Sequence, residues 1–568
     1  MKRHLAAAAT LLIISAGAAA QCLLTGEGAA RRLTLDGEPF IILGGELGNS
    51  TASSEAEVDA TFPRLKAMGL NTVLAPAYWD LMEPVEGKYD FRQVDKVIES
   101  ARANGLRVVF LWFGAWKNSM SCYAPEWFKT DTKRFPRART RQGKVMEIAS
   151  CVAPSVYEAD SKAFEALVTH IAEVDKERHT VVMLQIENEI GMLESARDYS
   201  PDSERLFRSA VPEGLLAYMR KNRKSLHPEF AKRWADHGGR KSGTWAEMFG
   251  SDDYADEIFQ AYQYALYVGR LAEVARRHVA IPLYVNAALN SRGRKPGQYP
   301  AAGPLAHLID LWKAGAPKVD FISPDIYDSG FESWTAQYSV CGNALFIPEM
   351  RRTEDNGAQA FYAIGRHKAL GVSPFAIEYN PADCKLAKAY ATLSKLTPVL
   401  AQDMPRRGLL FTGKEQVEAW QEDGMKVEAR HFFTLPWDPR ATDGSAWPAA
   451  GAIVIRLAEK EYIVAGSGIV MNFTSLKEAE AKEKETHVAL GEDGFVLGKA
   501  DGSATEQDAA DWSGVKRVGI VSVDVVEHQA DGTFRRLKRL NGDEDHQGRH
   551  VRIGVDDFQI LHVKLYEY

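Results

Sequence analysis

Two apolar runs of this chain each end directly in a carboxylic acid side chain, and this pattern restricts the fold more than any other feature. Residues 181–184 run into Gln185-Ile186-Glu187-Asn188-Glu189, and residues 344–347 run into Pro348-Glu349. In a parallel barrel an apolar run is a buried strand, and the side chains after it lie at the C-terminal mouth, where such barrels keep their chemistry. We therefore expect an α/β barrel with Glu189 and Glu349 at its mouth.

Strand-like and helix-like segments alternate through the first two thirds of the chain. Apolar residues recur at helical spacing over residues 94–101, for example, and Gly105 marks the end of that helix. The alternation predicts a (β/α)8 TIM barrel over residues 21–402, which begins with a hairpin that turns at Asp36-Gly37. The barrel strands are expected at residues 42–46, 71–75, 107–112, 181–184, 281–285, 319–323, 344–347 and 372–377.

The pattern changes at about Asp403. Strand-like segments follow one another with no helix of useful length between them, and Gly-Asp, Asp-Gly and Gly-Ser pairs separate many of them. This predicts an all-β, sandwich-like accessory domain over residues 403–568. The charged run 477–485 is expected to be a solvated surface segment. The strands are expected at residues 451–457, 462–465, 518–526 and 558–565.

Residues 1–20 have the layout of a cleaved signal peptide. Lys2 and Arg3 precede an apolar stretch, and small residues lead to an expected cut near Ala20. The protein is therefore expected to be secreted or periplasmic. Cys22 also fits a lipid anchor, but Gln21 is a poor residue to precede a lipidated cysteine, so soluble export is preferred. No later apolar run is long enough to span a bilayer.

Charge and cysteine content exclude some other classes of function. The net charge is −7 and no strongly basic block is present, which argues against a nucleic-acid partner. Cys122 and Cys151 fall in one predicted loop and could pair, while a chain with all five cysteines free is equally consistent with the sequence. Neither has His or Cys nearby at metal-ligand spacing, so no metal and no cofactor is predicted.

Two carboxyl groups that face each other across a site can divide the roles of acid and nucleophile. Glu189 and Glu349 occupy matching strand ends, which is hard to explain for two unrelated surface residues. We interpret the pair as the catalytic carboxyls of a retaining glycoside hydrolase.

Three motifs together resemble glycoside hydrolase family 35, the β-galactosidase family. They are Trp79…Glu83-Pro84-x-Glu86-Gly87-x-Tyr89-Asp90-Phe91, Gln185-Ile186-Glu187-Asn188-Glu189-x-Gly191 and Pro348-Glu349, and the resemblance covers roughly residues 30–400. It implies that Glu189 is the general acid/base and Glu349 the nucleophile. The β-rich tail looks like the accessory module of a bacterial branch of this family.

The resemblance also implies roles for neighbouring residues. Asn188 would bind the sugar 2-hydroxyl, and Tyr327, at the end of the sixth strand, matches a tyrosine that orients the nucleophile. A turn residue and a core tyrosine are the competing interpretations. Glu187 could bind sugar hydroxyls or support its neighbours, and the sequence does not separate these alternatives.

Aromatic residues near the strand ends are candidate platforms for sugar rings. Tyr78 and Trp79 end the second strand, and Trp116 lies just past the third and is the preferred candidate. The family usually has Ala-Glu-Trp after the third strand, and its Glu binds galactose hydroxyls. Here Trp116 is followed by Lys117 and Asn118, and one or the other of these is expected to take over that contact.

Two further positions bear on the sugar. Gly48-Asn49 replaces a His-Tyr pair that is usual after the first strand, and Glu378-Tyr379 ends the eighth strand, where it could line the site or be structural. These departures leave the mechanism intact and bear on which sugar is bound.

Together these features predict a secreted, retaining exo-β-galactosidase. It would remove terminal β-galactosyl units from oligosaccharides or from plant-type polysaccharide side chains such as those of xyloglucan. Another retaining β-glycosidase of the same clan, such as a β-glucosidase, and a barrel that binds glycan without cleaving it are the alternatives. The sequence makes no prediction about oligomeric state.

Overall fold

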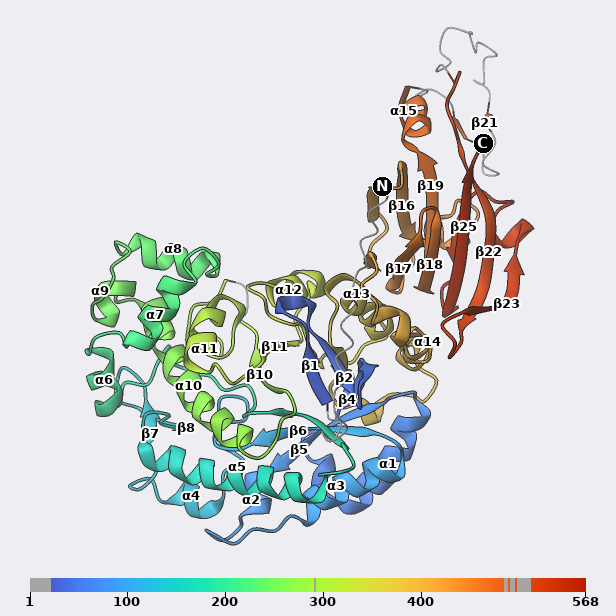
Figure 1. The fold of residues 1–568 in the computed structure, drawn as a ribbon. Coiled ribbons are helices and arrows are strands. Elements are labelled where there is room, and N and C mark those ends of the chain that lie inside the picture. The colour runs from blue at the N-terminus through green and yellow to red at the C-terminus, as the bar shows by residue number, and fades with distance from the viewer. Residues whose placement is uncertain (1–21, 291–292, 485–488, 491–495, 498–511) are drawn as a thin grey trace, which may run out of the picture.

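Eight parallel strands close into a barrel in the order β10-β11-β12-β13-β4-β5-β6-β9, which establishes the predicted TIM-barrel fold (Figure 1). The structure is a computed structural model, and it describes residues 22–290, 293–484, 489–490, 496–497 and 512–568. The predicted signal peptide lies outside these residues. The barrel strands are β4 (Ile42–Glu46), β5 (Thr72–Tyr78), β6 (Arg107–Phe113), β9 (Val181–Gln185), β10 (Leu283–Ala288), β11 (Phe321–Ile326), β12 (Ile347–Met350) and β13 (Gly371–Pro374).

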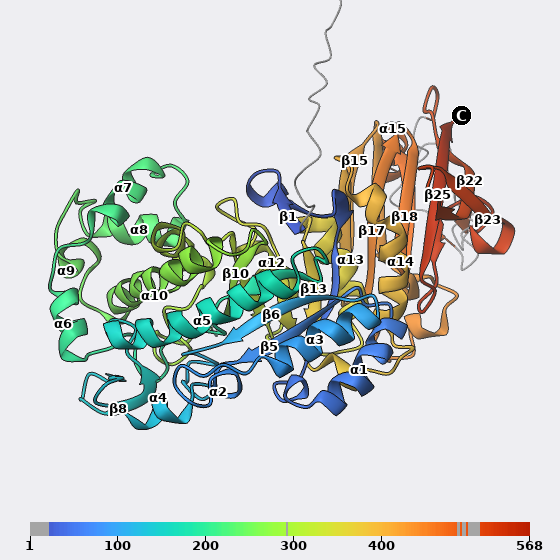
Figure 2. The same cartoon turned by 60° about the horizontal axis from the view of Figure 1, so that its bottom comes forward.

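Helices surround the barrel and return the chain from the end of each strand to the start of the next (Figure 2). In α3 the side chains of Val94, Val97, Ile98 and Ala101 form one buried stripe that covers the barrel. The helices that follow the eight strands are α1 (Glu55–Ala67), α3 (Arg92–Ala103), α5 (Pro154–Val174), α10 (Asp253–Arg276), α11 (Ile309–Gly315), α12 (Phe331–Gln337), α13 (Asn356–His367) and α14 (Lys385–Leu400).

Insertions after three of the strands enlarge one side of the barrel. The insertion after β9 forms the lobe at the left of Figure 1. Long segments at this end of a barrel commonly shape its site. The inserted elements are α2 (Trp79–Met82) after β5, α4 (Glu126–Thr130), β7 (Arg137–Arg139) and β8 (Val145–Ala149) after β6, and α6 (Pro201–Phe207), α7 (Glu213–Lys221), α8 (Pro228–Asp236) and α9 (Trp245–Phe249) after β9.

Some predicted strands were placed too early in the sequence. The seventh strand was expected at residues 344–347 and is Ile347–Met350. Ala344, Leu345 and Phe346 are buried beneath the barrel before the strand begins, so they are apolar for reasons of burial and not of strand pairing. As a result, Glu349 lies within the last residues of β12 and not after it.

A three-stranded antiparallel sheet precedes the barrel. It consists of β1 (Cys22–Thr25), β2 (Arg32–Leu35) and β3 (Glu38–Phe40), and Leu35 pairs with Glu38 across the predicted turn. Asp36 and Gly37 both have positive φ, +54° and +85°, as a two-residue type I′ hairpin turn requires.

The C-terminal region is a sandwich of a six-stranded and a four-stranded sheet, as predicted in outline. Apolar side chains of both sheets form one shared core. Residues 477–484 of the charged run belong to helix α15 (Leu476–Lys484), with Lys477, Glu480 and Lys482 exposed, which agrees with a solvated surface segment. The large sheet contains β14 (Arg406–Phe411), β17 (Ala450–Ala458), β18 (Glu461–Ser467), β25 (Gln559–Glu567), β22 (Val518–His528) and β23 (Phe534–Leu540), and the small sheet β15 (Val417–Glu422), β16 (Met425–His431), β19 (Ile469–Ser475) and β24 (Val551–Ile553). A further two-stranded sheet pairs β20 (Ala489–Leu490) with β21 (Val496–Leu497).

The sandwich packs tightly against helix α13 of the barrel (Figure 2). A side chain at Gly408 would put its Cβ 2.4 Å from the carbonyl oxygen of Tyr362, and one at Gly451 would put it 2.5 Å from that of Ala358. Glycine at these positions lets β14 and β17 lie directly on the helix. The connection from α14 to β14, which contains the predicted domain boundary at residues 402/403, therefore joins two parts in firm contact.

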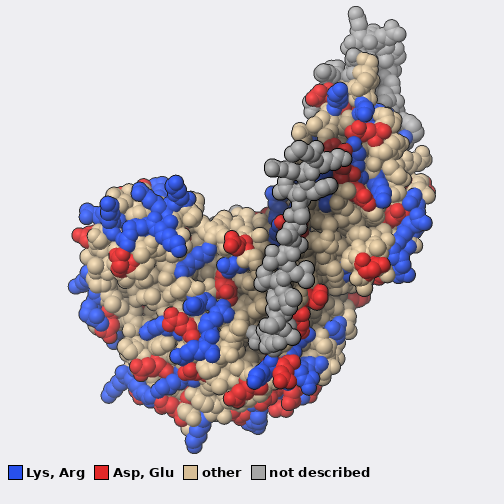
Figure 3. Space-filling view, viewed as in Figure 1, with Lys and Arg blue, Asp and Glu red and all other residues tan. Residues whose placement is uncertain are grey.

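Two remaining expectations concern membranes and cysteines. In the described part of the chain, no helix is both long and apolar enough to cross a bilayer. All five cysteines are free, so Cys122 and Cys151 do not pair; Cys151 is buried and accepts a hydrogen bond from Gln260, whereas Cys122 is exposed. Positive and negative side chains are interspersed over the face that Figure 3 shows.

Candidate active site

A cavity of about 330 Å3 opens at the C-terminal mouth of the barrel. Its walls come from the ends of seven of the eight strands or from the loops that follow them, so it lies where barrel enzymes carry their chemistry. The cavity brings together five residues that the sequence singled out, Glu189, Glu349, Tyr327, Lys117 and Asn118. The complete lining is Asn49, Lys117, Asn118, Glu189, Ala288, Pro300, Tyr327, Glu349 and Phe375.

A constrained backbone presents Glu189 to this cavity at the barrel mouth. Glu187 and Glu189 both have positive φ, +59° and +44°, which non-glycine residues rarely adopt. The amide of Glu189 donates to the Asn286 side chain over 3.0 Å, and its carbonyl accepts from the amide of Ser119 over 3.2 Å. These bonds to β10 and to the loop after β6 hold the strained turn in place.

The surroundings of Glu189 favour its protonated form. Its side chain is 5% exposed, and Asn118 donates a hydrogen bond to Oε2. Burial and then repulsion from Glu349 raise the pKa of Glu189 to about 7, although Lys117 opposes this. A carboxyl group with this pKa carries a proton in about half of the molecules at neutral pH, which suits a general acid.

Glu349 lies across the same cavity and is held by a hydrogen bond. Its side chain is 4% exposed, and the hydroxyl of Tyr327 donates to Oε1. Burial raises the pKa of Glu46, the last residue of β4, and Glu46 is close enough to Glu349 for repulsion between the two carboxyls to raise it further. The hydrogen bond from Tyr327 fixes the orientation of the Glu349 carboxyl in the cavity.

Two buried acids below the cavity were not found from the sequence. Burial raises the pKa of Glu46 and of Asp325 well above the ordinary range, and repulsion from Glu349 raises both further. Asp325 accepts from the side-chain amide of Asn286 over 2.6 Å, and repulsion from Glu189 also raises its pKa. The signal that could have found them is the one used for Glu189, a polar residue at the end of an apolar strand.

Lys117 supplies positive charge to this acidic group. Burial lowers the pKa of Lys117, but attraction to Glu349, Glu189 and the two deeper acids outweighs burial and raises it. Lys117 therefore stays charged. Its ammonium group lies among four carboxyl groups and offsets part of their mutual repulsion.

The raised pKa of Glu46 predicts a stability that falls as pH rises. Glu46 keeps its proton in the folded protein but loses it near pH 4.3 when unfolded, so unfolding releases a proton above that pH. We expect Glu46→Gln to reduce the loss of unfolding free energy between pH 5 and pH 7 by up to about 1.4 kcal/mol per pH unit. Urea unfolding at pH 5 and at pH 7 measures the difference in unfolding free energy. Glu99→Gln is the control, because Glu99 lies on the exposed side of α3. An unchanged pH dependence in Glu46→Gln would show that Glu46 is ionised in the folded protein.

Glu187 and Asn188 lie behind the cavity and do not line it. Glu187 is fully buried, accepts from the amide of Trp116 over 2.8 Å and shares a hydrogen bond with Asp160 on α5. Of the two roles considered, the structure thus gives Glu187 the supporting one. The side-chain amide of Asn188 is buried and has no hydrogen-bond partner among the described residues. Burying an amide without a partner is costly, so it remains a candidate for a sugar hydroxyl.

The expected sugar platform at Trp116 must be corrected. Its ring is completely buried and packs edge-on against Tyr264 and Tyr267 of α10, with centroids 5.7 and 4.8 Å apart. No face of the ring is open to a ligand. The chain reverses at Asn118-Ser119, where both residues have positive φ, +53° and +58°. The side chains of Lys117 and Asn118 reach the cavity, while Trp116 fills the space between barrel and helix.

Trp79 and Tyr78 are also core residues and do not line the cavity. Trp79 is fully buried and donates to Glu83 over 2.7 Å, and Tyr78 donates from its hydroxyl to the carbonyl of Asn49 over 2.7 Å. Tyr78 therefore acts on the site indirectly, by holding the loop that carries Asn49. Aromatic residues after strand ends fill the gaps between strands and surrounding helices, which sequence alone does not distinguish from ligand contact.

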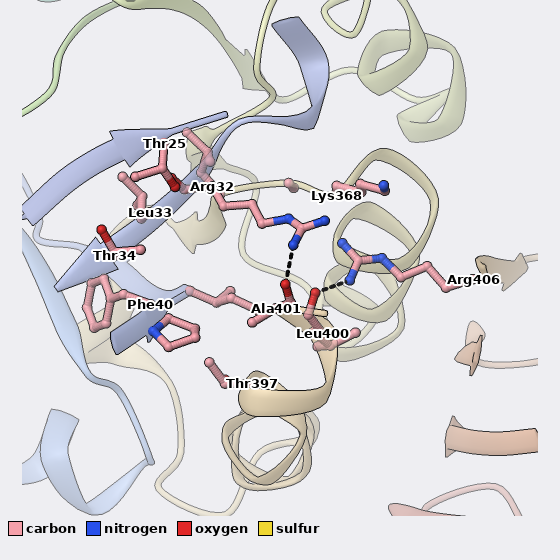
Figure 4. Close-up of a pocket in the computed structure, with 14 residues that line it drawn as sticks. Thr25, Arg32, Leu33, Thr34, Phe40, Lys368, Thr397, Leu400, Ala401 and Arg406 are labelled. Atoms are coloured by element: carbon pink, nitrogen blue, oxygen red, sulfur yellow. Dashed lines mark hydrogen bonds between the residues drawn. The ribbon is translucent and has the colours of Figure 1, made fainter. Parts of the chain in front are cut away.

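A cavity of about 170 Å3 lies at the opposite end of the barrel (Figure 4). There Arg32 donates to the carbonyl of Ala401, and Arg406 donates over 2.5 Å to that of Leu400. These carbonyls end α14, where cationic side chains are favourable. The groups shown in Figure 4 thus join the N-terminal sheet, the barrel and the start of the sandwich, and offer no paired carboxyls.

Family models match two parts of the chain. A model described as "Beta-galactosidase", of the glycoside hydrolase family 42 type, matches residues 50–234, and a "Domain of unknown function" matches residues 386–552. The barrel thus contains a β-galactosidase-like glycoside hydrolase segment. The resemblance to family 35 is not confirmed, and family 42 is the closer of the two.

Individual proteins that match parts of the chain also carry the name β-galactosidase. Human "Beta-galactosidase-1-like protein 3" is 28% identical over 198 residues, which are 34% of this chain and 28% of that protein, so the match spans little more than a quarter of the curated relative. Solved β-galactosidases from Marinomonas ef1 and Bacillus circulans sp. alkalophilus are 13% and 14% identical, with TM-scores of 0.44 and 0.43. They cover 63% and 64% of this chain, and 60% and 57% of their own chains.

Proposed function

We propose that the protein is a retaining exo-β-galactosidase in which Glu189 is the general acid/base and Glu349 the nucleophile. One observation carries the proposal. Two buried carboxyl groups line one cavity at the barrel mouth; burial and repulsion raise the pKa of Glu189 to about 7, and Glu349 accepts a hydrogen bond from Tyr327. An acid that carries a proton, beside a second carboxyl group in the same cavity, is what acid-assisted glycoside cleavage requires.

The proposed reaction has two steps. Glu189 gives its proton to the glycosidic oxygen while Glu349 attacks the anomeric carbon, so the bond to the leaving group breaks and a galactosyl ester of Glu349 forms. The leaving sugar departs as an alcohol. Glu189, now ionised, removes a proton from water, which attacks the same carbon, releases Glu349 and yields β-galactose. Asn188 would hydrogen-bond the sugar 2-hydroxyl during both steps.

The cavity and the leader support the more specific parts of the proposal. A volume of about 330 Å3 is at the lower end of the range for small-ligand sites, about 300–1,000 Å3, and suits one terminal sugar. The leader of residues 1–20 supports secretion or a periplasmic location, where oligosaccharides or polysaccharide side chains are accessible. No nucleic-acid partner is proposed.

Two alternatives remain to be separated by experiment. Because Lys117 and Asn118 stand where the family 35 pattern has a glutamate that binds galactose, another β-glycoside is the first alternative. A glycan-binding barrel without turnover is the second. The raised pKa of Glu189 disfavours it, because binding alone needs no tuned acid.

The deciding experiment follows wild-type protein with a β-galactoside by NMR. We expect β-galactose as the first product, before mutarotation. α-Galactose would exclude the double displacement. Turnover of another β-glycoside in a parallel panel, with none of the galactoside, would keep the mechanism and change the sugar, and no turnover of any β-glycoside would support the binding protein.

A further inference from the structure

We propose that a second cavity at the barrel mouth binds the sugar unit to which the terminal galactose is attached, so that the substrate is an oligosaccharide or polysaccharide branch. The inference rests on the proposed function and deepens it. This outer cavity has a volume of about 310 Å3, and Arg352, Glu354, Tyr379, Asn380 and Lys385 are among the residues that line it.

The outer cavity lies beside the catalytic cavity, because the same two strands lead into both. β12 carries Glu349, and Arg352 follows three residues later; the loop after β13 carries Phe375 of the catalytic cavity and Tyr379 four residues later. Three or four residues of chain span at most roughly 10–14 Å. A sugar that projects from the catalytic cavity therefore meets the outer cavity within the length of one or two sugar units.

Tyr379 is presented to solvent by a rigid turn. It is 70% exposed, more than any other large apolar side chain in the described part of the molecule. Ala376 before it has φ +51°, an uncommon conformation for alanine, and Arg352 stabilises this turn by donating to the carbonyl of Ala376 over 2.6 Å.

Glu378 fixes the same turn from the other side. Its carboxylate accepts from the amide of Gly48 over 2.9 Å and from the hydroxyl of Thr51, and its carbonyl accepts from Arg64 over 3.1 Å. Glu378 is thus structural, and the turn is anchored to the loop after β4 and to α1. A strained turn held from both sides fixes the backbone that carries Tyr379, which reduces the entropy lost when a ligand binds to its ring.

The chemistry of the outer cavity suits an uncharged sugar. An aromatic ring offers an apolar face to the C–H face of a sugar, while the guanidinium of Arg352, 5.3 Å from the Tyr379 ring centroid, and Asn380 offer donors for its hydroxyls. Glu354 offers acceptors, and its charge opposes that of Arg352. Lys385 is paired with Asp556 over 3.0 Å, so it adds no free charge for an acidic ligand.

The ion pair between Lys385 and Asp556 also connects the C-terminal sandwich to the lining of the outer cavity. Asp556 lies in the sandwich just before β25, and the sandwich further donates an amide, that of Ala449, to Asp355 over 3.1 Å. Both contacts lie at the first residues of α13 and α14, next to the outer cavity. The sandwich therefore braces the outer wall of the cavity.

The test compares two substrates that differ in what they place in the outer cavity. β-Galactosyl fluoride occupies only the galactose site, whereas a β-galactosyl disaccharide also carries a second sugar. We expect Tyr379→Ala to lower the ratio of kcat/KM for the best disaccharide of a linkage panel to kcat/KM for the fluoride by about tenfold, the value of one aromatic stacking contact. Tyr379→Phe keeps the ring and should keep the ratio within about twofold of wild type.

Tyr568→Ala is the matched control, since Tyr568 is 57% exposed and is the last residue of the sandwich. It should leave both rates unchanged. Equal losses on both substrates in Tyr379→Ala, or an unchanged ratio, would overturn the outer subsite while the proposed function stands. A wild-type protein that cleaves neither substrate would instead overturn the proposed function, and the subsite with it.

Discussion

Glu349→Ala is expected to lower kcat on a β-galactoside by about 10⁴- to 10⁶-fold, as loss of a covalent nucleophile typically does. The variant keeps the acid Glu189 but has no group placed to form the glycosyl ester. Glu349 is buried and accepts a hydrogen bond from Tyr327, so no other carboxylate can take its place without moving the barrel wall. Initial rates with an aryl β-galactoside measure the effect.

Azide separates the roles of the two carboxyls. In Glu349→Ala the space left by the side chain admits azide, which attacks an activated galactoside directly and yields the α-galactosyl azide. In Glu189→Ala the ester on Glu349 still forms from an activated substrate, and azide then yields the β-galactosyl azide. Glu99→Ala, on the exposed face of α3, should retain full activity. If Glu349→Ala instead gave the β-azide and Glu189→Ala the α-azide, Glu189 would be the nucleophile and Glu349 the acid.

The position of Glu189 and Glu349 at the barrel mouth could be predicted because their signal is local. An apolar run followed by a glutamate needs no knowledge of the partner strand, and the rule that chemistry lies at the C-terminal ends of barrel strands does the rest. The same locality explains why the Asp36-Gly37 turn was predicted correctly, since its conformation depends on two residues.

The surroundings of these carboxyls could not be predicted in the same way. Whether Trp116 faces a ligand or the core depends on Tyr264 and Tyr267, which belong to a helix more than a hundred residues later. The acids Glu46 and Asp325 become important because burial keeps them protonated next to Glu349, and neither burial nor adjacency is visible in a single sequence.

The sandwich shows an intermediate case. Strand β16 alternates buried Met425, Val427 and Ala429 with half-exposed charged residues, which is the period-two pattern of a half-buried strand. It was missed because a search for apolar runs passes over charged alternation. Strand β16 could therefore have been predicted from the sequence. Its pairing with β15 and β19 could not, because the pairing depends on the fold.

Activity on a β-galactosyl disaccharide is expected to fall as pH rises through about 7. The group responsible is Glu189, whose pKa is raised to about 7 by burial and by repulsion from Glu349. A raised carboxyl pKa means that the acid is protonated below pH 7 and ionised above it, and an ionised Glu189 has no proton to give to the glycosidic oxygen. The pH profile of kcat/KM reports this pKa in the free enzyme, and we expect a tenfold loss per pH unit well above it.

β-Galactosyl fluoride tests whether the alkaline loss arises from Glu189 as an acid. Fluoride leaves without a proton, so with this substrate kcat/KM should stay level from pH 7 to pH 9 in wild type. A parallel fall for both substrates would instead assign the loss to the binding site or to unfolding, to which Glu46 and Asp325 contribute as they ionise.

Replacing Lys117 tests the pKa assignment of Glu189 by the direction in which the pH profile moves. Because Lys117 lowers the pKa of Glu189, Lys117→Met should shift the alkaline limb with the disaccharide to higher pH, and a shift to lower pH would contradict the arrangement of charges described for the cavity.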